Sequence, residues 1–409
     1  MKIWLKYVLG CLLGIIASAV LPLESASVQK VLSFLTEFAV RFGRFTLLPL
    51  LFFSMVVAVF NLRDSNLLLK TAFQTVFMVV MSSLVLVVLA LVSAVIIKLP
   101  RIPISVEKVS ETVNLDIPAR LLQLFPFAGF DSFLDGAYLL PLFVLAGFAG
   151  AGCASDKAAS KPAVNLFDSL SKLSYSVMSF FIDMLAVGLI AISCTWFIQF
   201  KGVILSGVFT PLILLLAGNL IVVTLLMYPL IMRFVFKEMH PYRVMYASVS
   251  SIITAFFSGD TNLVLPINIR HAKESLGVKR RLNAVTLPVF STFARGGSAL
   301  VTAISFIIIL RSYSSLGVSL SDVLWIGLIS FILSFFLGAF PAGGTFVSLT
   351  LLCTLYGRGF DAGYLLLKPM AVVLGSFAAA IDAATAMAGS YIIASKMKMT
   401  EHRELKKFI

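Results

Sequence analysis

The chain has 409 residues, of which 60% are hydrophobic and 12% charged, and its mean hydropathy is +1.03. This composition excludes a soluble globular protein of that length and is typical of a polytopic membrane protein. The net charge of +13 does not indicate a nucleic-acid partner, because the basic residues lie in short loops between apolar runs. No serine–histidine or aspartate pair has catalytic spacing, so an enzyme is not expected.

The amino-terminal residues 1–27 contain a basic start, an apolar middle and small residues, as a signal peptide does. Their apolar part runs over residues 8–23, however, and all that follows is also membrane-embedded, so a first membrane helix is the preferred interpretation. Other runs long enough to cross about 30 Å of hydrocarbon follow it. They are residues 45–60, 71–97, 140–152, 179–200, 203–236, 285–310 and 323–340, with two more after residue 346. The sequence therefore predicts about eight spans and some shorter segments.

The basic residues cluster on one side if eight helices are counted from a cytoplasmic amino terminus. The clusters are Lys2/Lys6, Arg63/Lys70, Arg233/Lys237/Arg243, Lys273/Lys279/Arg280/Arg281 and Lys396/Lys398/Arg403/Lys406/Lys407. By the positive-inside rule, both termini are expected in the cytoplasm and the protein in the cytoplasmic membrane.

Some polar and cysteine residues are expected to have structural roles only. Glu37, Arg41 and Arg44 lie one helical turn apart and are interpreted as an interfacial, salt-bridged face. The three histidines are expected to be solvated loop residues, and the four cysteines to be small core residues without metal or redox spacing. They are His240, His271 and His402, and Cys11, Cys153, Cys194 and Cys353.

The second half of the chain differs from the first because its apolar runs are broken by Gly, Ser, Thr, Pro and Asp. The breaks are SVSSIITAFFSGDTNLVLP (248–266), FARGGSAL (293–300) and GAFPAGGTFVSL (338–349). Hydrocarbon cannot satisfy exposed backbone groups, so such segments must be buried in protein or line a polar cavity. Paired interruptions in successive units indicate a transporter site, although ordinary helix-to-helix turns are the alternative interpretation.

The breaks at 248–266 and 338–349 are each followed by a helix that carries one buried charge. Arg295 follows Gly259 by 36 residues, and Asp382 follows Gly343 by 39. An unpaired ionised group at the membrane centre costs about 2.5–3.5 kcal/mol on insertion scales, so Arg295 needs a partner, and Asp382 and Asp260 are the candidates. We predict that Arg295 and Asp382 meet near the bilayer midplane, either as part of a binding site or as a purely structural ion pair.

Several stretches in this order resemble the dicarboxylate/amino acid:cation symporter family, which has the glutamate transporter fold. They are MKIWLKYVLGCLLGIIASAVLP, RFGRFTLLPLLFFSMVVAVFNLRD, LPINIRHAKESLGV, TLPVFSTFARGGSAL and AFPAGG. The resemblance covers nearly the whole chain. It implies an all-α membrane protein of eight transmembrane helices and two re-entrant hairpins, a scaffold, a transport domain that moves as an elevator, and a homotrimer.

The resemblance also implies boundaries. Residues 1–66 and 120–200 would form the scaffold and trimer contacts, and residues 67–119 and 201–409 the transport domain. Within the latter, hairpin 1 would span about 244–270, a broken helix 7 about 283–311, hairpin 2 about 323–360 and helix 8 about 363–395.

The ion motifs of that family are altered here. Its helix 7 carries an Asn-Met-Asp-Gly-Thr type motif, but this chain has Ala294-Arg295-Gly296-Gly297-Ser298 at the matching positions. Its helix 8 pattern of Asp, Arg-Thr, Asn and Gly-Asp becomes Ala379, Asp382-Ala383, Ala386 and Gly389-Ser390. The family's sodium-binding carboxylates thus map to Gly296 and Ser390, and little or no sodium dependence is expected. Pro341 and Gly344 of hairpin 2 keep the pattern.

These observations favour a secondary active transporter, symporter-like, that moves a small organic solute such as an amino acid or carboxylate. A proton-coupled or uncoupled exchanger, or an anion-conducting channel or sensor on the same fold, are the alternatives. The expected solute-binding residues are Arg295, Asp382, Ser258, Asp260, Thr261, Asn262, Ser298, Gly343, Gly344, Thr345 and Ser390. No cofactor or metal site is predicted. The coupling ion is left open between Na⁺ and H⁺, and the expected partners are the solute, membrane lipid and further copies of the chain.

Overall fold

The structure is a computed structural model that describes residues 2–21, 25–103, 122–313, 318–401, 403–404 and 408–409. Over these residues every regular element is a helix, and the only β-structure is two isolated bridges. Seven helical segments in this part of the chain are long and apolar enough to cross a membrane, and three shorter apolar helices accompany them. The prediction of an all-α polytopic membrane protein is confirmed.

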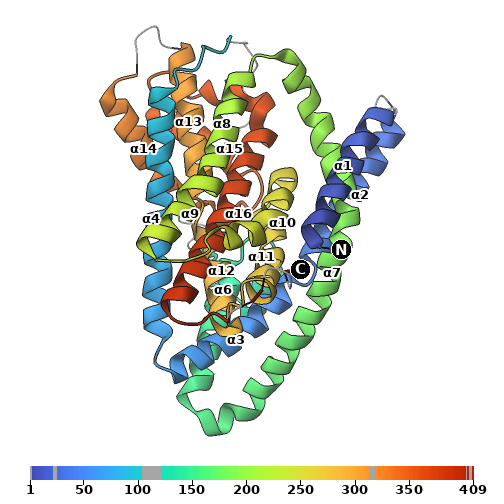
Figure 1. Ribbon diagram of the computed structural model, residues 1–409, viewed down its shortest axis with the longest axis vertical. Coiled ribbons are helices and arrows are strands. Elements are labelled where there is room, and N and C mark those ends of the chain that lie inside the picture. Colours follow the sequence, from blue (N-terminus) through green and yellow to red (C-terminus); the bar gives the residue numbers. More distant parts are fainter. Residues whose placement is uncertain (1, 22–24, 104–121, 314–317, 402, 405–407) are drawn as a thin grey trace.

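A first group of helices consists of the long helix α7 and four helices that pack around it. The group contains α1 (Ile3–Val20), α2 (Ala26–Arg44), α3 (Leu47–Asp64), α6 (Leu140–Ser155) and α7 (Lys157–Ser206). All four of the other helices pack against α7, and α6 also packs on α3. In Figure 1, α7 with α1 and α2 forms the right-hand side of the molecule.

A second group surrounds helix α13 (Gly296–Tyr313). Its other members are α4 (Leu68–Ile96), α8 (Thr210–Ile221), α9 (Tyr228–Leu230), α10 (Tyr242–Ser258), α11 (Thr261–Glu274), α12 (Arg280–Phe293), α14 (Leu320–Ser334), α15 (Gly344–Tyr356) and α16 (Ala371–Lys396). Two π-helical segments, Val222–Met227 and Ile231–Val235, flank α9. α13 packs against α4, α14, α15 and α16, and every residue from Gly296 to Leu310 is buried. The two groups meet at several places, which include α12 on α3, α10 on α7 and α11 on α2. Their division into a scaffold and a moving part stays a prediction.

Two helical hairpins lie in the second group. Hairpin 1 consists of α10 and α11, and hairpin 2 of α14 and α15 with a 3₁₀ turn at Leu337–Ala339. Each tip contains a glycine in the left-handed region, Gly259 with φ +62° and Gly343 with φ +73°, which allows the chain to reverse without the cost that a Cβ would add. The tips touch through a bridge between Asp260 and Ala342.

The third predicted break separates α12 from α13. Phe293 is the last residue of α12 and Gly296 the first of α13, so Ala294 and Arg295 are not helical. Helix 8 consists of a 3₁₀ segment, Gly363–Met370, that leads into α16. All three interruptions seen in the sequence are therefore real breaks in the backbone.

The two ends of the chain meet on the same side of the molecule. The Lys2 ammonium donates to the Tyr246 hydroxyl at 3.0 Å, and the Phe408 ring lies 6.0 Å from the Tyr246 ring. Figure 1 places the N and C labels close together. The two ends therefore lie together, and their side of the membrane stays a prediction.

Several expectations about individual segments were wrong. The span predicted at residues 45–60 is present as α3 (Leu47–Asp64), but the helix before it, α2 (Ala26–Arg44), was not among the predicted runs. The run at 203–236 is interrupted at Gly207, where φ is +68° and α7 ends. The run at 323–340 does not form one span, since α14 ends at Ser334 and the chain turns into the tip of hairpin 2.

Arg44 and His271 do not lie where the sequence predicts, since Arg44 is only partly exposed and His271 is buried. Arg41 pairs with Glu37 on the exposed face as predicted, at 2.5 Å, but Arg44 turns away from that face and pairs with the buried Asp260. His271 is only 1% exposed and contacts the Ser275 hydroxyl, whereas His240 is exposed and His402 lies outside the described residues. Three cysteines are buried, and Cys153 is partly exposed.

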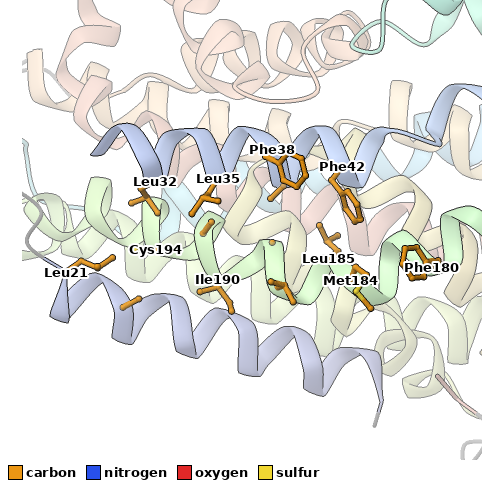
Figure 2. A pocket seen from close by; sticks show the side chains of 15 residues that line it. Leu21, Leu32, Leu35, Phe38, Phe42, Phe180, Met184, Leu185, Ile190 and Cys194 are labelled. Atoms are coloured by element: carbon orange, nitrogen blue, oxygen red, sulfur yellow. The ribbon is translucent and has the colours of Figure 1, made fainter. Parts of the chain in front are cut away.

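A large apolar cavity lies between α1, α2 and α7 and does not include the predicted solute site. Its volume is about 680 Å³, and its lining side chains include Leu35, Phe38 and Met184. Figure 2 shows these side chains pointing into the space between the three helices. Among the described residues that line this cavity, none is charged.

Candidate solute site

The tips of both hairpins, the break before α13 and helix α16 enclose a small polar cavity. Its lining residues are Gly259, Arg295, Ser298, Pro341, Gly343, Gly344, Thr345, Gly375, Ala379 and Asp382. The free volume is about 10 Å³, which is about the space that one water molecule needs. The structure therefore shows the site in a closed form. A solute could enter it only if at least one hairpin moved.

Arg295 connects both hairpin tips from inside. Its side chain is 3% exposed. Nη1 donates to the Thr261 hydroxyl of hairpin 1, and Nη2 donates to the Phe340 carbonyl of hairpin 2 at 2.6 Å. Nε lies 4.0 Å from Oδ2 of Asp382 and has no hydrogen-bond partner. One donor of a buried cation thus remains available beside the cavity.

Asp382 faces Arg295 from α16 and is held by the first turn of α13. Its Oδ1 accepts the backbone N–H of Gly297 at 2.7 Å, and Oδ2 accepts the Ser298 hydroxyl at 3.0 Å. A carboxylate at a helix N-terminus is stabilised by the unsatisfied N–H groups and by the helix dipole. The prediction that the two opposite charges meet is confirmed by this geometry.

The two glycines after Arg295 allow α13 to approach its neighbours closely. A Cβ at Gly296 would lie 2.8 Å from Cα of Ser83 in α4, and one at Gly297 would lie 2.6 Å from the carbonyl oxygen of Ala378 in α16. These distances are too short for any side chain. The position that matches a sodium-binding carboxylate in the resemblance therefore has no space for one.

The remaining predicted residues divide between the cavity and its outside. Thr345 donates to Ser298 at 3.4 Å, and both line the cavity together with Gly343 and Gly344. Thr261 reaches the site through Arg295. These residues and the charged pair are brought together as the sequence suggested.

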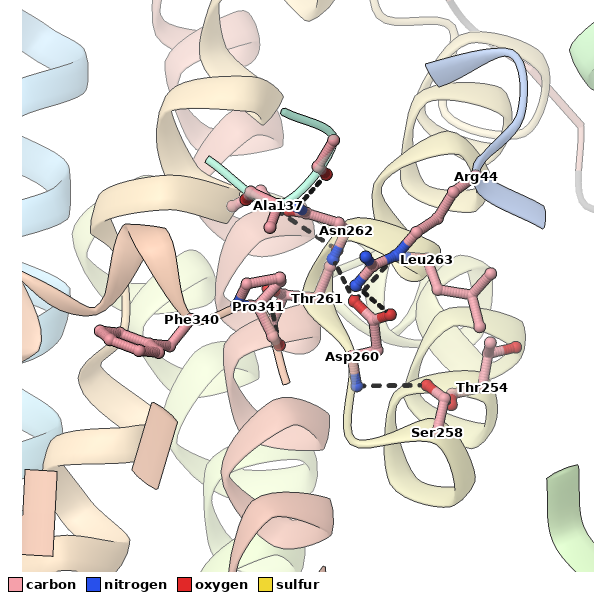
Figure 3. Close-up of polar contacts among 12 residues, drawn as sticks. Arg44, Ala137, Thr254, Ser258, Asp260, Thr261, Asn262, Leu263, Phe340 and Pro341 are labelled. Carbon is pink, nitrogen blue, oxygen red and sulfur yellow. Dashed lines mark hydrogen bonds and ion pairs between the residues drawn. The ribbon is translucent and has the colours of Figure 1, made fainter. Parts of the chain in front are cut away.

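Besides Thr261, four predicted residues do not line the cavity. Ser258 donates to the Thr254 carbonyl at 2.6 Å within α10. Ser390 bonds to the Thr286 hydroxyl at 2.7 Å, about two helical turns beyond Asp382. Asp260 and Asn262 point toward α2 and the loop before α6, as Figure 3 shows.

The sequence interpretation missed the backbone groups of hairpin 2 and the small residues of α16. The Phe340 carbonyl carries no sequence signal, because every residue has one. Gly375 and Ala379 precede Asp382 at helical spacing, so they share its face, and that periodicity was a usable signal.

A second pocket of about 430 Å³ lies directly outside the cavity. It is formed by α2 and α7 on one side and by both hairpin tips on the other, and Gly259, Gly343 and Gly375 line both spaces. The hairpin tips therefore separate the small cavity from a larger space against the first helix group.

Comparison with known proteins agrees with this arrangement. Residues 1–396 match the model of the Sodium:dicarboxylate symporter family. The chain belongs to this family. The residues matched include both helix groups and both hairpins, so the earlier resemblance is confirmed.

Individual relatives are distant. The chain is 26% identical over 378 residues to the "Serine/threonine transporter SstT" of Lacticaseibacillus paracasei, which covers 90% of this chain and 78% of that protein. It is 27% identical over 139 residues to the "Putative sodium-dependent excitatory amino acid transporter glt-6" of Caenorhabditis elegans, covering 34% of this chain. A second protein of that organism, glt-3, is 30% identical over 125 residues. The matches span only about a quarter of the length of these two nematode relatives, 25% and 23%.

Proposed function

We propose that this family member is a secondary active transporter, a symporter that carries a small zwitterionic amino acid between Arg295 and Asp382. The observation that supports the proposal is one buried cation facing one buried carboxylate across a single cavity, with Nε of Arg295 unpartnered. A zwitterion carries the two complementary charges. The one relative above that aligns along most of this chain is named a serine/threonine transporter.

The arrangement suggests how each end of the solute is bound. The guanidinium offers a side edge, Nε and Nη2, that matches a carboxylate with two parallel hydrogen bonds. Nη2 is used by the Phe340 carbonyl of hairpin 2, so opening that hairpin frees the edge. The solute ammonium takes the place of the guanidinium beside Asp382. Among the lining residues no second cation is present, which disfavours a dicarboxylate.

We also propose that transport depends little on sodium. A hard cation needs about six oxygen ligands, usually with carboxylates among them. Gly296 has no room for a carboxylate, and Ser390 is bonded to Thr286. Arg295 already supplies a fixed positive charge beside Gly296. Uptake into proteoliposomes should change by less than about twofold when Na⁺ replaces K⁺ outside, and a steep dependence on sodium concentration would contradict the proposal. A proton is the remaining candidate coupling ion.

The solute class is tested by thermal stability of the purified protein. A ligand that binds only the folded state raises its stability by RT ln(1 + [L]/Kd), so no assumption about coupling is needed. Neutral amino acids, dicarboxylates and monocarboxylates are compared with and without sodium at two pH values. Neutral amino acids should give the largest stabilisation. Stabilisation by a dicarboxylate alone would overturn the zwitterion proposal, and stabilisation by a monocarboxylate only at the lower pH would indicate that a proton neutralises Asp382 instead.

A channel or sensor on the same fold is distinguished by kinetics. Saturable counterflow of the solute that the thermal screen identifies supports the carrier. Discrete conductance steps in a planar bilayer without counterflow would support a channel.

Assembly and orientation are further parts of the proposal. We expect a homotrimer whose subunits contact one another through the first helix group. We also expect the protein to lie in the inner membrane with both termini in the cytoplasm. Ala26→Cys, at the exposed start of α2, and Glu404→Cys, in the exposed tail, should react with a membrane-impermeant thiol reagent from opposite sides. Labelling from one side only would refute the predicted orientation.

A further inference from the structure

The tip of hairpin 1 lies between two arginines that belong to different helix groups. Thr261 accepts from Arg295 on the inner side, while the neighbouring Asp260 pairs with Arg44 on the outer side. Arg44 is the last residue of α2, just before the turn that separates α2 from α3. Figure 3 shows the Arg44 side chain reaching from α2 to the Asp260 carboxylate. Two consecutive residues therefore link the solute cavity to the first helix group.

Both carboxylate oxygens of Asp260 are engaged. Oδ2 pairs with Nη2 of Arg44, and Oδ1 accepts the backbone N–H groups of Asn262 at 2.9 Å and Leu263 at 3.2 Å. The carboxylate is thus the N-cap of α11 as well as an ion-pair partner. The Asp260 side chain is 4% exposed and that of Arg44 is 23% exposed. Because the carboxylate is buried, losing its cation is far more costly than losing a surface partner.

Asn262 provides a second link to the first helix group. Its Nδ2 donates to the carbonyls of Gly136 at 3.2 Å and Ala137 at 3.0 Å, in the loop that precedes α6. Both of its amide hydrogens are therefore used, and both acceptors lie outside the hairpin. The tip is therefore held at two residues, Asp260 and Asn262, that lie two positions apart in the sequence.

The same tip is tied to hairpin 2. The backbone N–H of Thr261 donates to the Pro341 carbonyl at 3.1 Å, and Asp260 bridges Ala342. Whatever holds hairpin 1 therefore also holds hairpin 2, through main-chain contacts that do not depend on side chains.

We infer that Arg44 and the loop carbonyls of Gly136 and Ala137 form a latch on Asp260 and Asn262 that fixes both hairpin tips against α2 and α6. Release of the latch is a required step whenever the hairpins move away from the first helix group. Only the statement that the latch must release during hairpin movement rests on the proposed transport function. The contact between hairpin 1 and the first helix group can be measured without any solute. Arg44 is therefore a positioning residue, because its side chain affects the cavity only through hairpin 1.

A pair of introduced cysteines reports on the latch. A Cβ at Gly43 of α2 would touch the side chain of Leu263 in α11. Gly43→Cys with Leu263→Cys, in a chain whose four native cysteines are replaced by alanine, should therefore form a disulfide quickly under mild oxidation. The rate of that reaction measures how much of the time hairpin 1 lies against α2.

Two substitutions remove the ion pair with little other change. Asp260→Asn keeps an oxygen that caps α11 but loses the charge, and Arg44→Gln removes the cation. Each should slow cross-linking by about tenfold or more, and the double variant should lose no more than either single one, because the two residues act through one contact. Arg44→Lys keeps the charge and should stay within about threefold of the parent. Asn262→Asp places an acceptor against two carbonyls and should also slow the reaction by about tenfold.

Arg41→Gln is the matched control. Arg41 lies one turn before Arg44 on the same helix, and its pair with Glu37 is exposed, with side-chain exposures of 79% and 63%. Its loss should leave the cross-linking rate unchanged. Unchanged rates in the Asp260 and Arg44 variants, additive losses in the double variant, or an equal loss in Arg41→Gln would each overturn the latch.

Hydrogen exchange gives an independent measurement in the chain with native cysteines and no reporter pair. Amides of the segment 259–264 should exchange about tenfold faster in Asp260→Asn and in Arg44→Gln than in the unmodified protein or in Arg41→Gln. Equal exchange in all four proteins would also overturn the inference. Neither measurement uses a solute, so failure of the latch leaves the thermal screen unaffected, and failure of the screen leaves the latch intact.

Discussion

Helices α1 and α12–α13 are both apolar enough to cross a membrane, yet they occupy opposite environments. In the most apolar stretch of α1, 33% of the residues are buried within the protein. In the most apolar stretch of Arg280–Tyr313, 94% are buried. The exposed residues of α1 are large, such as Leu12 at 50% and Leu13 at 54%. The buried start of α13 is instead Gly296, Gly297 and Ser298. Apolar character therefore identifies a membrane segment, while small and polar interruptions identify the segments at the centre of the protein.

The physical reason is that lipid tails are as apolar as leucine. A helix that faces lipid gains nothing from close approach, whereas a central helix packs best where small residues let backbones come together. Polar groups are tolerated only in the second environment, because other chain segments can satisfy them there. The contrast between the two helices can be tested by substitutions that should be costly in one and mild in the other.

The largest effect is expected at the charged pair. Arg295→Ala and Asp382→Ala should each lower the free energy of unfolding by about 3–5 kcal/mol, because each leaves a buried charge without its partner. The double variant should recover much of that loss. Leu13→Ala on the outer face of α1 is the comparison and should change stability by about 0.5 kcal/mol or less. Denaturant unfolding in detergent measures all four, and additive losses at the pair would refute the coupling.

A smaller effect is expected from adding one methyl group. Gly296→Ala places a Cβ 2.8 Å from Cα of Ser83, a backbone atom that cannot move aside alone. It should cost about 1–3 kcal/mol, as overpacking does. Gly147→Ala in α6, where a Cβ meets open space, should be neutral or stabilising by about 0.5–1 kcal/mol. The same denaturant unfolding assay applies, and equal effects at the two glycines would show that α13 is not closely packed.

The smallest effect is expected on the outer face of α2. Arg41→Ala removes an exposed pair with Glu37 and should change the free energy of unfolding by about 0.2–0.5 kcal/mol. Raising the salt concentration should reduce even this difference. A loss above about 1 kcal/mol would mean that the pair is shielded from solvent by another subunit, which size measurements on the purified protein would then show.

Much of the site could be predicted because ionised groups at membrane depth restrict the possible arrangements. Arg295 needed an anion, and few carboxylates lie in apolar runs, so Asp382 followed from the sequence. Asp260 was the other candidate partner of Arg295, and nothing in the sequence indicated that it would pair with Arg44 instead. The separation in sequence between α2 and hairpin 1 does not indicate which arginine lies next to the Asp260 carboxylate in the fold.

The sequence by itself determined the solvent of this protein, the places where its helices break and the two charges that must be neutralised. These features follow from composition, from the residue types that helices exclude, and from the cost of an unpaired charge in hydrocarbon. Only the tertiary structure decided which partners meet: Arg44 with Asp260, Asn262 with two loop carbonyls, and Arg295 with the Phe340 carbonyl. Backbone carbonyls are the same in every residue, so the folded arrangement alone selects the ones that a buried side chain can reach.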